Sequence, residues 1–129
     1  MVLDTSVVVA AFRSRLGASN ALLRLVAERR LVPLATVALF LEYEDVLTRP
    51  EQRDAAGLTL EDVERVFAAL ASAIEPVEVH YAWRPQLDDP DDELVLEAAV
   101  NGRADAAVTQ CARLCSDRHP IRYAHCSSR

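Results

Sequence analysis

The sequence has 129 residues, 51% of them hydrophobic, and a formal net charge of −6. This length and apolar content predict one globular domain over residues 1–129 and exclude a disordered chain. No apolar run approaches the ~20 residues that span a bilayer, and no basic segment precedes an apolar stretch at the N-terminus, so we expect a cytoplasmic protein with no membrane association.

Short apolar strands alternate with amphipathic helices in chain order. The predicted strands are 1–3, 31–36, 76–80 and 105–109. The predicted helices are 6–12, 19–30, 37–50, 59–74 and 91–102, with N-caps at Ser19, Thr36 and Thr59, a stop at Pro50 and a closing Gly102. This alternation predicts an α/β fold with a mainly parallel central sheet of four to five short strands flanked by helices. In such sheets function collects at the carboxyl ends of the strands.

Acidic residues stand where those strands end. Asp4 follows the first strand, where it serves equally well as a helix N-cap or as a functional carboxylate. On the helix from Val37, the apolar stripe leaves Glu42 and Glu44 at its two edges and Asp45 in solvent, and the helical geometry does not choose between the two glutamates.

The densest acidic cluster is "LDDPDDELVLEAA". Capping of the helix that follows explains acids at this place without any function. However, the apolar face of that helix leaves Asp91 and Asp92 toward the protein and points Glu93 away. Asp4, Glu42 or Glu44, and Asp91 or Asp92 would together form a hard oxygen site for Mg²⁺ or Mn²⁺. Such a site activates water for the hydrolysis of a phosphodiester.

Competing readings lack the residues that they need. A phosphoryl-accepting receiver domain requires a lysine, and all 14 basic residues are arginines. A haloacid-dehalogenase-type phosphatase requires a second Asp two residues after the first, where this chain has Ser6. A protein-binding relic without catalysis remains open.

Five arginines could form an RNA-facing strip near Asp4, although most arginines spaced in this way are merely solvated. They are Arg13, Arg15, Arg24, Arg29 and Arg30.

In the order in which they occur, "VLDTSVVVAAF", "LEYEDVLTRP", "DDPDDELVLEAA" and "GRADAAVT" resemble the PIN-domain ribonucleases, in particular the toxin components of toxin-antitoxin pairs. The similarity covers roughly residues 1 to 109. It implies a three-layer PIN-like fold, Mg²⁺-dependent (or Mn²⁺-dependent) endoribonuclease activity, a neutralising antitoxin partner and a homodimer. It also selects Glu42 over Glu44 and Asp92 over Asp91. By this resemblance Asp4 and Asp92 ligate the metal, while Glu42 ligates it or positions the attacking water.

The chain departs from the family after Thr109. The family has an Asp or Asn and then an Asp-Phe pair, but this chain continues "QCARLC". Read one nucleotide late with permitted codons, the stretch from Gln110 yields N-A-R-D-F. We therefore hypothesise that a frameshift replaced the native C-terminus from about Gln110, with impaired activity as a consequence. The DNA should then read CAA at Gln110, CGA at Arg113 and CTT at Leu114. The codons CAG, CGC and CTG at these positions would refute the frameshift hypothesis.

The rival interpretation of the tail is a structural zinc site. All three cysteines lie beyond residue 110, and reduced thiols are the default in a protein that is not secreted. The spacing of Cys111, Cys115, His119 and either His125 or Cys126 falls within the range of zinc ligands. A single Cys/His tract that contains Pro120 is nevertheless a weak signal. About one Zn²⁺ per chain after purification in metal-free buffer would favour this site.

Overall fold

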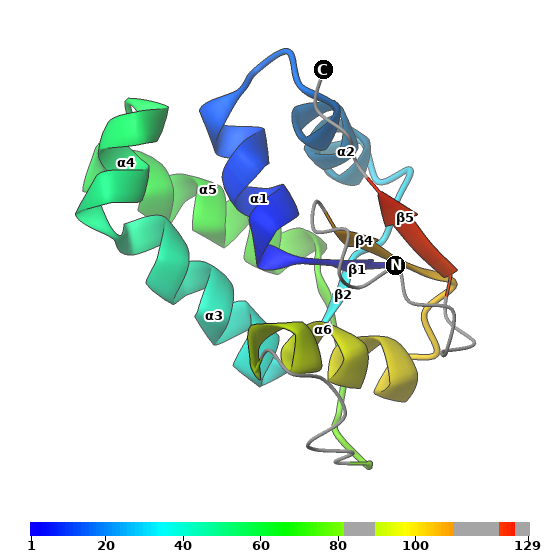
Figure 1. Cartoon of the computed structure of the whole chain (residues 1–129). Coiled ribbons are helices and arrows are strands. Elements are labelled where there is room, and N and C mark those ends of the chain that lie inside the picture. Colours follow the sequence, from blue (N-terminus) through cyan, green and yellow to red (C-terminus); the bar gives the residue numbers. More distant parts are fainter. Residues whose placement is uncertain (82–89, 110–121, 126–129) are drawn as a thin grey trace.

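The structure is a computed structural model that describes residues 1–81, 90–109 and 122–125, with the backbone alone at 90–91 and 122–125. Within these ranges the strands are β1 Val2–Leu3, β2 Leu34–Ala35, β3 Glu75–Pro76, β4 Ala106–Thr109 and β5 Arg122–His125. They form one parallel sheet in the order β3-β2-β1-β4-β5 (Figure 1). The predicted α/β class with a mainly parallel sheet of four to five strands is confirmed.

The core lies around the short central strand β1. Val2 pairs with Leu34 on one side and with Ala107 on the other, and Leu3 pairs with Val108. Val2 and Leu3 are almost completely buried. Burial on both faces explains why this strand reads as a continuous apolar run and not as an alternating one.

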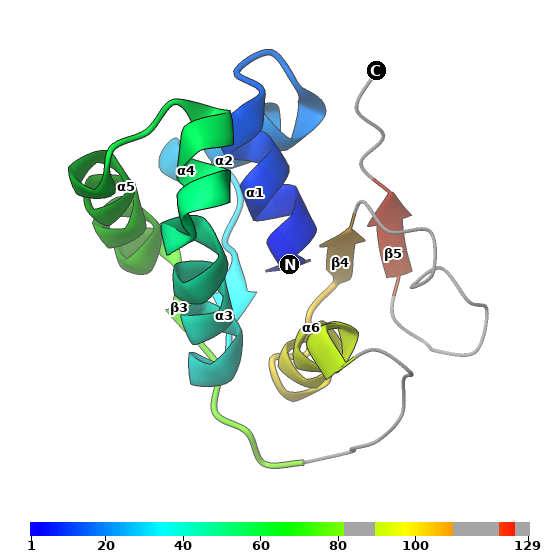
Figure 2. The ribbon, with the colours of Figure 1, turned by 60° about the vertical axis from the view of Figure 1, so that its left-hand side comes forward.

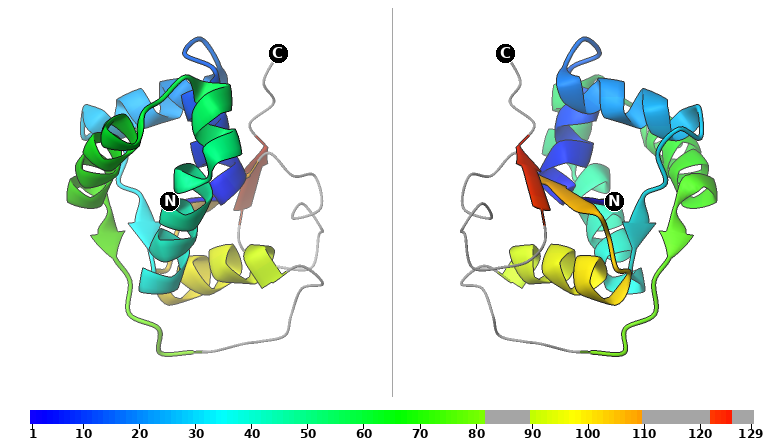
Figure 3. Two further views of the ribbon diagram at one scale, coloured as in Figure 1. Left: turned by 90° about the vertical axis from the view of Figure 1, so that its left-hand side faces the viewer. Right: turned by 90° about the vertical axis from the view of Figure 1, so that its right-hand side faces the viewer.

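Six helices accompany the sheet in the described ranges: α1 Thr5–Arg13, α2 Ala18–Ala27, α3 Val37–Thr48, α4 Pro50–Ala56, α5 Leu60–Ala73 and α6 Pro90–Asn101. The connections from β1 through β2 to β3 move along the sheet in one direction, while the connection through α6 returns to β4. Right-handed crossovers therefore place α6 on the opposite face from α1 and α2. Figures 1, 2 and 3 show this arrangement, with the strands between α6 below and α1 and α2 above.

This topology creates a switch point between β1 and β4, the two neighbouring strands at which the direction of winding reverses. Crevices at such points are where open α/β sheets bind ligands, outside the carboxyl ends of the strands. The residues at this place are Asp4, directly after β1, and Thr109, the last residue of β4.

Two of the predicted helix starts are confirmed in detail. The hydroxyl of Thr36 accepts the backbone N–H of Leu39, and Thr59 forms a capping box with Asp62 in which both reciprocal hydrogen bonds are present. The backbone and hydroxyl hydrogen bonds from Thr59 lower the pKa of Asp62. Polar residues that satisfy the first N–H groups of a helix thus mark these boundaries correctly.

The predicted N-cap at Ser19 is wrong. Gly17 occupies the N-cap of α2, and Ser19 lies inside the first turn, where it is buried. The side chain of Asn20 donates to the carbonyl of Ala11 and fixes this first turn against α1. Contact with α1 therefore sets the start of α2 in place of a capping hydroxyl.

The third predicted helix is two helices. α3 ends at Thr48, Arg49 is extended, and Pro50 is the first residue of α4. A residue before proline avoids the helical conformation, whereas proline itself suits the first turn because that turn needs no N–H donor. Pro50 therefore begins a helix that the sequence analysis did not predict.

The predicted strand 76–80 is also wrong for most of its length, since β3 consists of Glu75 and Pro76. The backbone N–H groups of His80 and Tyr81 both donate to the side-chain oxygen of Asn101. The side-chain nitrogen of Asn101 donates to the carbonyl of Tyr81. These hydrogen bonds tie the segment to the end of α6, so the backbone groups of His80 and Tyr81 do not extend the sheet.

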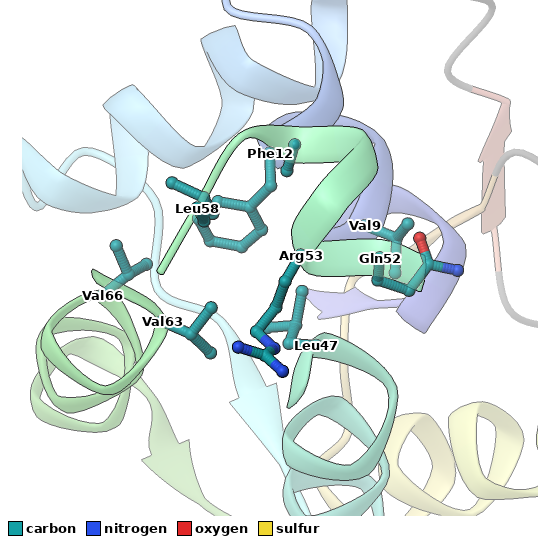
Figure 4. Close-up of a pocket in the computed structure, with 9 residues that line it drawn as sticks. Val9, Phe12, Leu47, Gln52, Arg53, Leu58, Val63 and Val66 are labelled. Carbon is teal, nitrogen blue, oxygen red and sulfur yellow. The ribbon is translucent and has the colours of Figure 1, made fainter. Parts of the chain in front are cut away.

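The helices α1, α4 and α5 pack closely around a small apolar hollow (Figure 4). Its free volume of about 10 Å³ holds at most one water molecule. The stem of Arg53 crosses this hollow beside Leu47 and Val63, and its Nε donates to the carbonyl of Thr48 at 3.2 Å.

In the described part of the chain, none of the helices is long and apolar enough to cross a bilayer.

Candidate active site

Asp4 is held at the switch point by backbone on both sides. Its N–H donates to the carbonyl of Val108 on β4 at 2.9 Å, and its own carbonyl accepts the first hydrogen bonds of α1. Its side chain is only 8% exposed. The position therefore combines the two roles that the sequence leaves open, the end of a buried strand and the N-cap of a helix.

The two carboxylate oxygens of Asp4 have different surroundings. Oδ2 accepts two short hydrogen bonds, 2.7 Å from the Ser6 hydroxyl and 2.6 Å from the Thr109 hydroxyl. Oδ1 accepts the backbone N–H of Ser6 at a longer 3.4 Å. In the described ranges no arginine forms an ion pair with this carboxylate. Oδ2 is thus fixed by protein donors, while Oδ1 keeps lone pairs that another group can use.

Tyr43 ties α3 to the same point. Its hydroxyl donates to the carbonyl of Leu3, the residue before Asp4, from a side chain that is almost fully buried. Burial raises the pKa of Tyr43, and the negative charge of Asp4 raises it further. The tyrosine therefore stays neutral and fixes the distance between α3 and the end of β1.

The two glutamates of α3 are separated by the structure. Glu42, next to Tyr43, is half-buried, whereas Glu44 and Asp45 are exposed. The oxygen of Asp45 accepts from Arg49 at 2.6 Å, an ordinary surface ion pair. Both glutamates were predicted at the edges of the buried stripe. In the structure Glu42 is the less exposed of the two.

On α6 two glutamates are buried, which was not predicted. Glu93 is 5% exposed and Glu97, one turn later, is 9% exposed, while Asp92 is half-buried. At about 100° per residue, Glu93 and Glu97 lie on the side of α6 away from its core residues Val95 and Ala99. The apolar pattern therefore predicts the direction of Glu93 but not its burial.

Three candidate residues lie on elements that meet near the switch point. Asp4 follows β1, Glu42 lies on α3, and Asp92 lies in the first turn of α6, while α6 contacts both β1 and α3. Figure 1 shows α1 and α6 on opposite faces of the sheet, with both helices starting on its left, where β1 leads into α1. The side chains of Asp88, Asp89 and Asp91 lie outside the described residues.

The donor chemistry at this place suits a hard cation, because two hydroxyl groups hold the buried carboxylate of Asp4 and no arginine among the described residues pairs with it. The geometry is incomplete. Among the residues that the structure describes, no three His, Cys, Asp or Glu side chains are grouped so that they could hold a metal ion. Asp4 therefore fits the part of a metal ligand, and the assembly of the full ligand set stays a prediction.

The proposed zinc ligands Cys111, Cys115, His119 and Cys126 lie outside the described residues, as does the side chain of His125. The onset of the hypothetical frameshift at Gln110 lies outside them too. Both interpretations of the tail remain predictions.

Comparison with known protein families matches residues 1–110 to the PIN domain. A search of curated proteins and a search of solved structures gave no significant match. The matched range ends at the point where the sequence departs from the pattern of the resembling family.

Proposed function

The chain belongs to the PIN-domain family, and on that premise we propose that it is a cytoplasmic, Mg²⁺-dependent endoribonuclease. The PIN domain is a family of nucleases, which supports phosphodiester hydrolysis as the reaction class. The specific substrate, RNA, and the role as the toxin of a toxin-antitoxin pair are part of the proposal, as are a cognate antitoxin partner and a homodimer.

The observation that carries the proposal is the asymmetry of Asp4. A helix cap alone needs one side-chain oxygen. Here two hydroxyls hold Oδ2, and Oδ1 is left with a single long hydrogen bond at the switch point of the sheet. A fixed carboxylate with one oxygen available is what a ligand to a hard cation requires.

In the proposed roles, Asp4 and Asp92 hold a Mg²⁺ or Mn²⁺ ion, and Glu42 holds it as well or orients the water that attacks the phosphodiester. A bound divalent ion supplies charge neutralisation at the phosphate and a more acidic water. Thr109 and Ser6 keep the Asp4 carboxylate in one rotamer through their hydrogen bonds. Tyr43 fixes α3, and with it Glu42, relative to β1.

The test compares RNA cleavage in Mg²⁺ by the unaltered chain and by Asp4→Asn, which keeps the capping oxygen. We expect Asp4→Asn to lower the cleavage rate at least about a hundredfold, because the loss of a metal ligand removes several kcal/mol of charge stabilisation. Glu44→Gln is the matched control, since Glu44 is exposed on the same helix as Glu42. It should cleave at the unaltered rate.

One observation favours a second candidate function, a non-catalytic PIN-like protein that only binds an antitoxin or another protein. In the described ranges no group of three metal-binding side chains is assembled. Equal background rates for the unaltered chain and for Asp4→Asn would reject the ribonuclease and leave this candidate.

A further inference from the structure

A hollow of about 410 Å³ lies between α1 and α2 and begins beside the candidate active site. Helices α1 and α2 pack directly on each other (Figures 1 and 2). The residue at the inner end of the hollow is Ser6, the same residue whose hydroxyl holds Oδ2 of Asp4. Ser6 therefore links the hollow to the carboxylate at the switch point.

The described residues that line this hollow include no acid. They are Ser6, Val9, Ala10, Arg13, Ser14, Gly17 and Ser19. This lining contains three serines and one arginine in a chain whose net charge is −6. Gly17 keeps Ser14 close, because a Cβ at Gly17 would lie 3.1 Å from the Ser14 hydroxyl oxygen.

Arg13, the last residue of α1, is exposed at the outer end of the hollow. Its guanidinium donates to the amide oxygen of Gln52 at 2.5 Å, so a neutral group holds it. Among the described residues it forms no ion pair, whereas the guanidinium of Arg65 is paired with Glu61 and Asp62. The positive charge of Arg13 is oriented without being neutralised.

We propose that this hollow binds the sugar-phosphate backbone of a single-stranded RNA substrate, with Arg13 on a phosphate remote from the one that reacts. Arginine and serine side chains are the usual contacts of phosphate oxygens. Ser6 and Arg13 lie about 10 Å apart along the axis of α1, so a strand in the hollow continues toward Asp4. The identification of the ligand as RNA rests on the proposed function, but the groove and its charge do not.

The test measures binding without cleavage. The fluorescence anisotropy of a short fluorescein-labelled oligouridine is titrated with the full chain in EDTA, at salt concentrations from about 50 to about 200 mM. We expect Arg13→Gln to weaken binding about tenfold, since one charge-assisted contact is lost. The slope of log affinity against log salt should fall by about 0.7, the value for one phosphate contact on a single strand. Arg13→Lys should keep the slope.

Arg65→Gln is the control, because this exposed arginine on α5 is already paired with carboxylates. It should bind like the unaltered chain. Equal affinities and slopes for Arg13→Gln and the unaltered chain would overturn the proposal. So would equal losses in Arg13→Gln and Arg65→Gln, or no measurable binding by the unaltered chain.

Failure of this inference is distinguishable from failure of the proposed function. If the unaltered chain cleaves RNA but Arg13→Gln binds normally, the groove assignment fails and the ribonuclease stands. If no variant cleaves but Arg13→Gln binds less tightly, the ribonuclease fails and the groove stands.

Discussion

At the scale of single residues, Thr109 is the partner on which the setting of Asp4 depends most. Its hydroxyl is completely buried and donates to Oδ2 of Asp4 at 2.6 Å, across 105 positions of sequence. This side-chain hydrogen bond thus adds to the backbone pairing of two strands that are distant in sequence. This threonine ends the motif "GRADAAVT", but no role was predicted for it.

Thr109→Val should lower the free energy of unfolding by about 2 kcal/mol, because it removes a buried hydrogen bond to a charged acceptor while keeping the side-chain shape. Urea denaturation measures this change. Thr48→Val is the control, since the Thr48 hydroxyl donates only to carbonyls of its own helix. It should change stability by less than about 0.5 kcal/mol, and equal effects of the two variants would contradict the assigned role of Thr109.

Tyr43 makes stability depend on pH in the alkaline range. Its pKa is raised by burial and by Asp4, so above about pH 10 the unfolded chain loses the phenol proton and the folded chain keeps it. The stabilising contribution is thus complete below the ordinary tyrosine pKa and decreases as the pH rises above it. Relative to Tyr43→Phe, the unaltered chain should lose about 1.4 kcal/mol of unfolding free energy per pH unit there. Parallel pH profiles of the two chains would refute this.

At the scale of elements, the end of α6 is defined by close packing. α6 ends at Asn101, directly before Gly102 as predicted, but the residue with left-handed backbone is Arg103, at φ 49°. Gly102 is needed because a Cβ there would lie 2.8 Å from the Ala98 carbonyl oxygen and 2.9 Å from a methyl group of Val77. The glycine lets α6 approach the segment that follows β3.

Gly102→Ala should destabilise the fold by about 1–3 kcal/mol, since backbone and core side chains must move to admit the methyl group. Thermal and urea denaturation both report this. Gly57→Asn provides the comparison, because Gly57 has φ 67° and open space around it, and asparagine tolerates that conformation. If Gly102→Ala is no more destabilising than Gly57→Asn, close approach is not the reason for this glycine.

Sequence patterns located elements better than they located element ends. The caps at Thr36 and Thr59 were recognisable because their partners lie within four residues. The division at Pro50 depends on local backbone geometry. The start of α2, however, depends on a contact with α1, and the short β3 depends on contacts with Asn101. These partners are remote in sequence. Local rules alone cannot supply such contacts.

At the scale of the whole molecule, topology explains why the candidate site could be anticipated in part. The position of Asp4 followed from a buried strand and the rule for parallel sheets. The choice between Glu42 and Glu44 did not follow from helix geometry, whereas their exposure in the folded chain differs. The burial of Glu93 and Glu97 was not predicted, because the apolar residues of α6 lie on the other side of the helix.

The molecule as a whole combines a net charge of −6 with a hollow that has no acid among its described lining residues and that reaches Ser6, a hydrogen-bond partner of Asp4. An ion held by the carboxylates would offset negative charge at the reaction centre, and Arg13 would attract the strand beside it. These two positive charges would allow an acidic protein to bind a polyanionic substrate.

The central claim is that three acids from distant parts of the chain hold one divalent ion. Electron paramagnetic resonance of free Mn²⁺ measures its binding directly in the unaltered chain and in Asp4→Asn, Glu42→Gln, Asp92→Asn and Glu44→Gln. We expect Asp4→Asn and Asp92→Asn to bind at least about tenfold more weakly and Glu44→Gln to bind normally. Glu42→Gln separates the two proposed roles of Glu42, since it weakens binding only where Glu42 ligates the ion. Equal Mn²⁺ affinity in all five proteins would contradict the account.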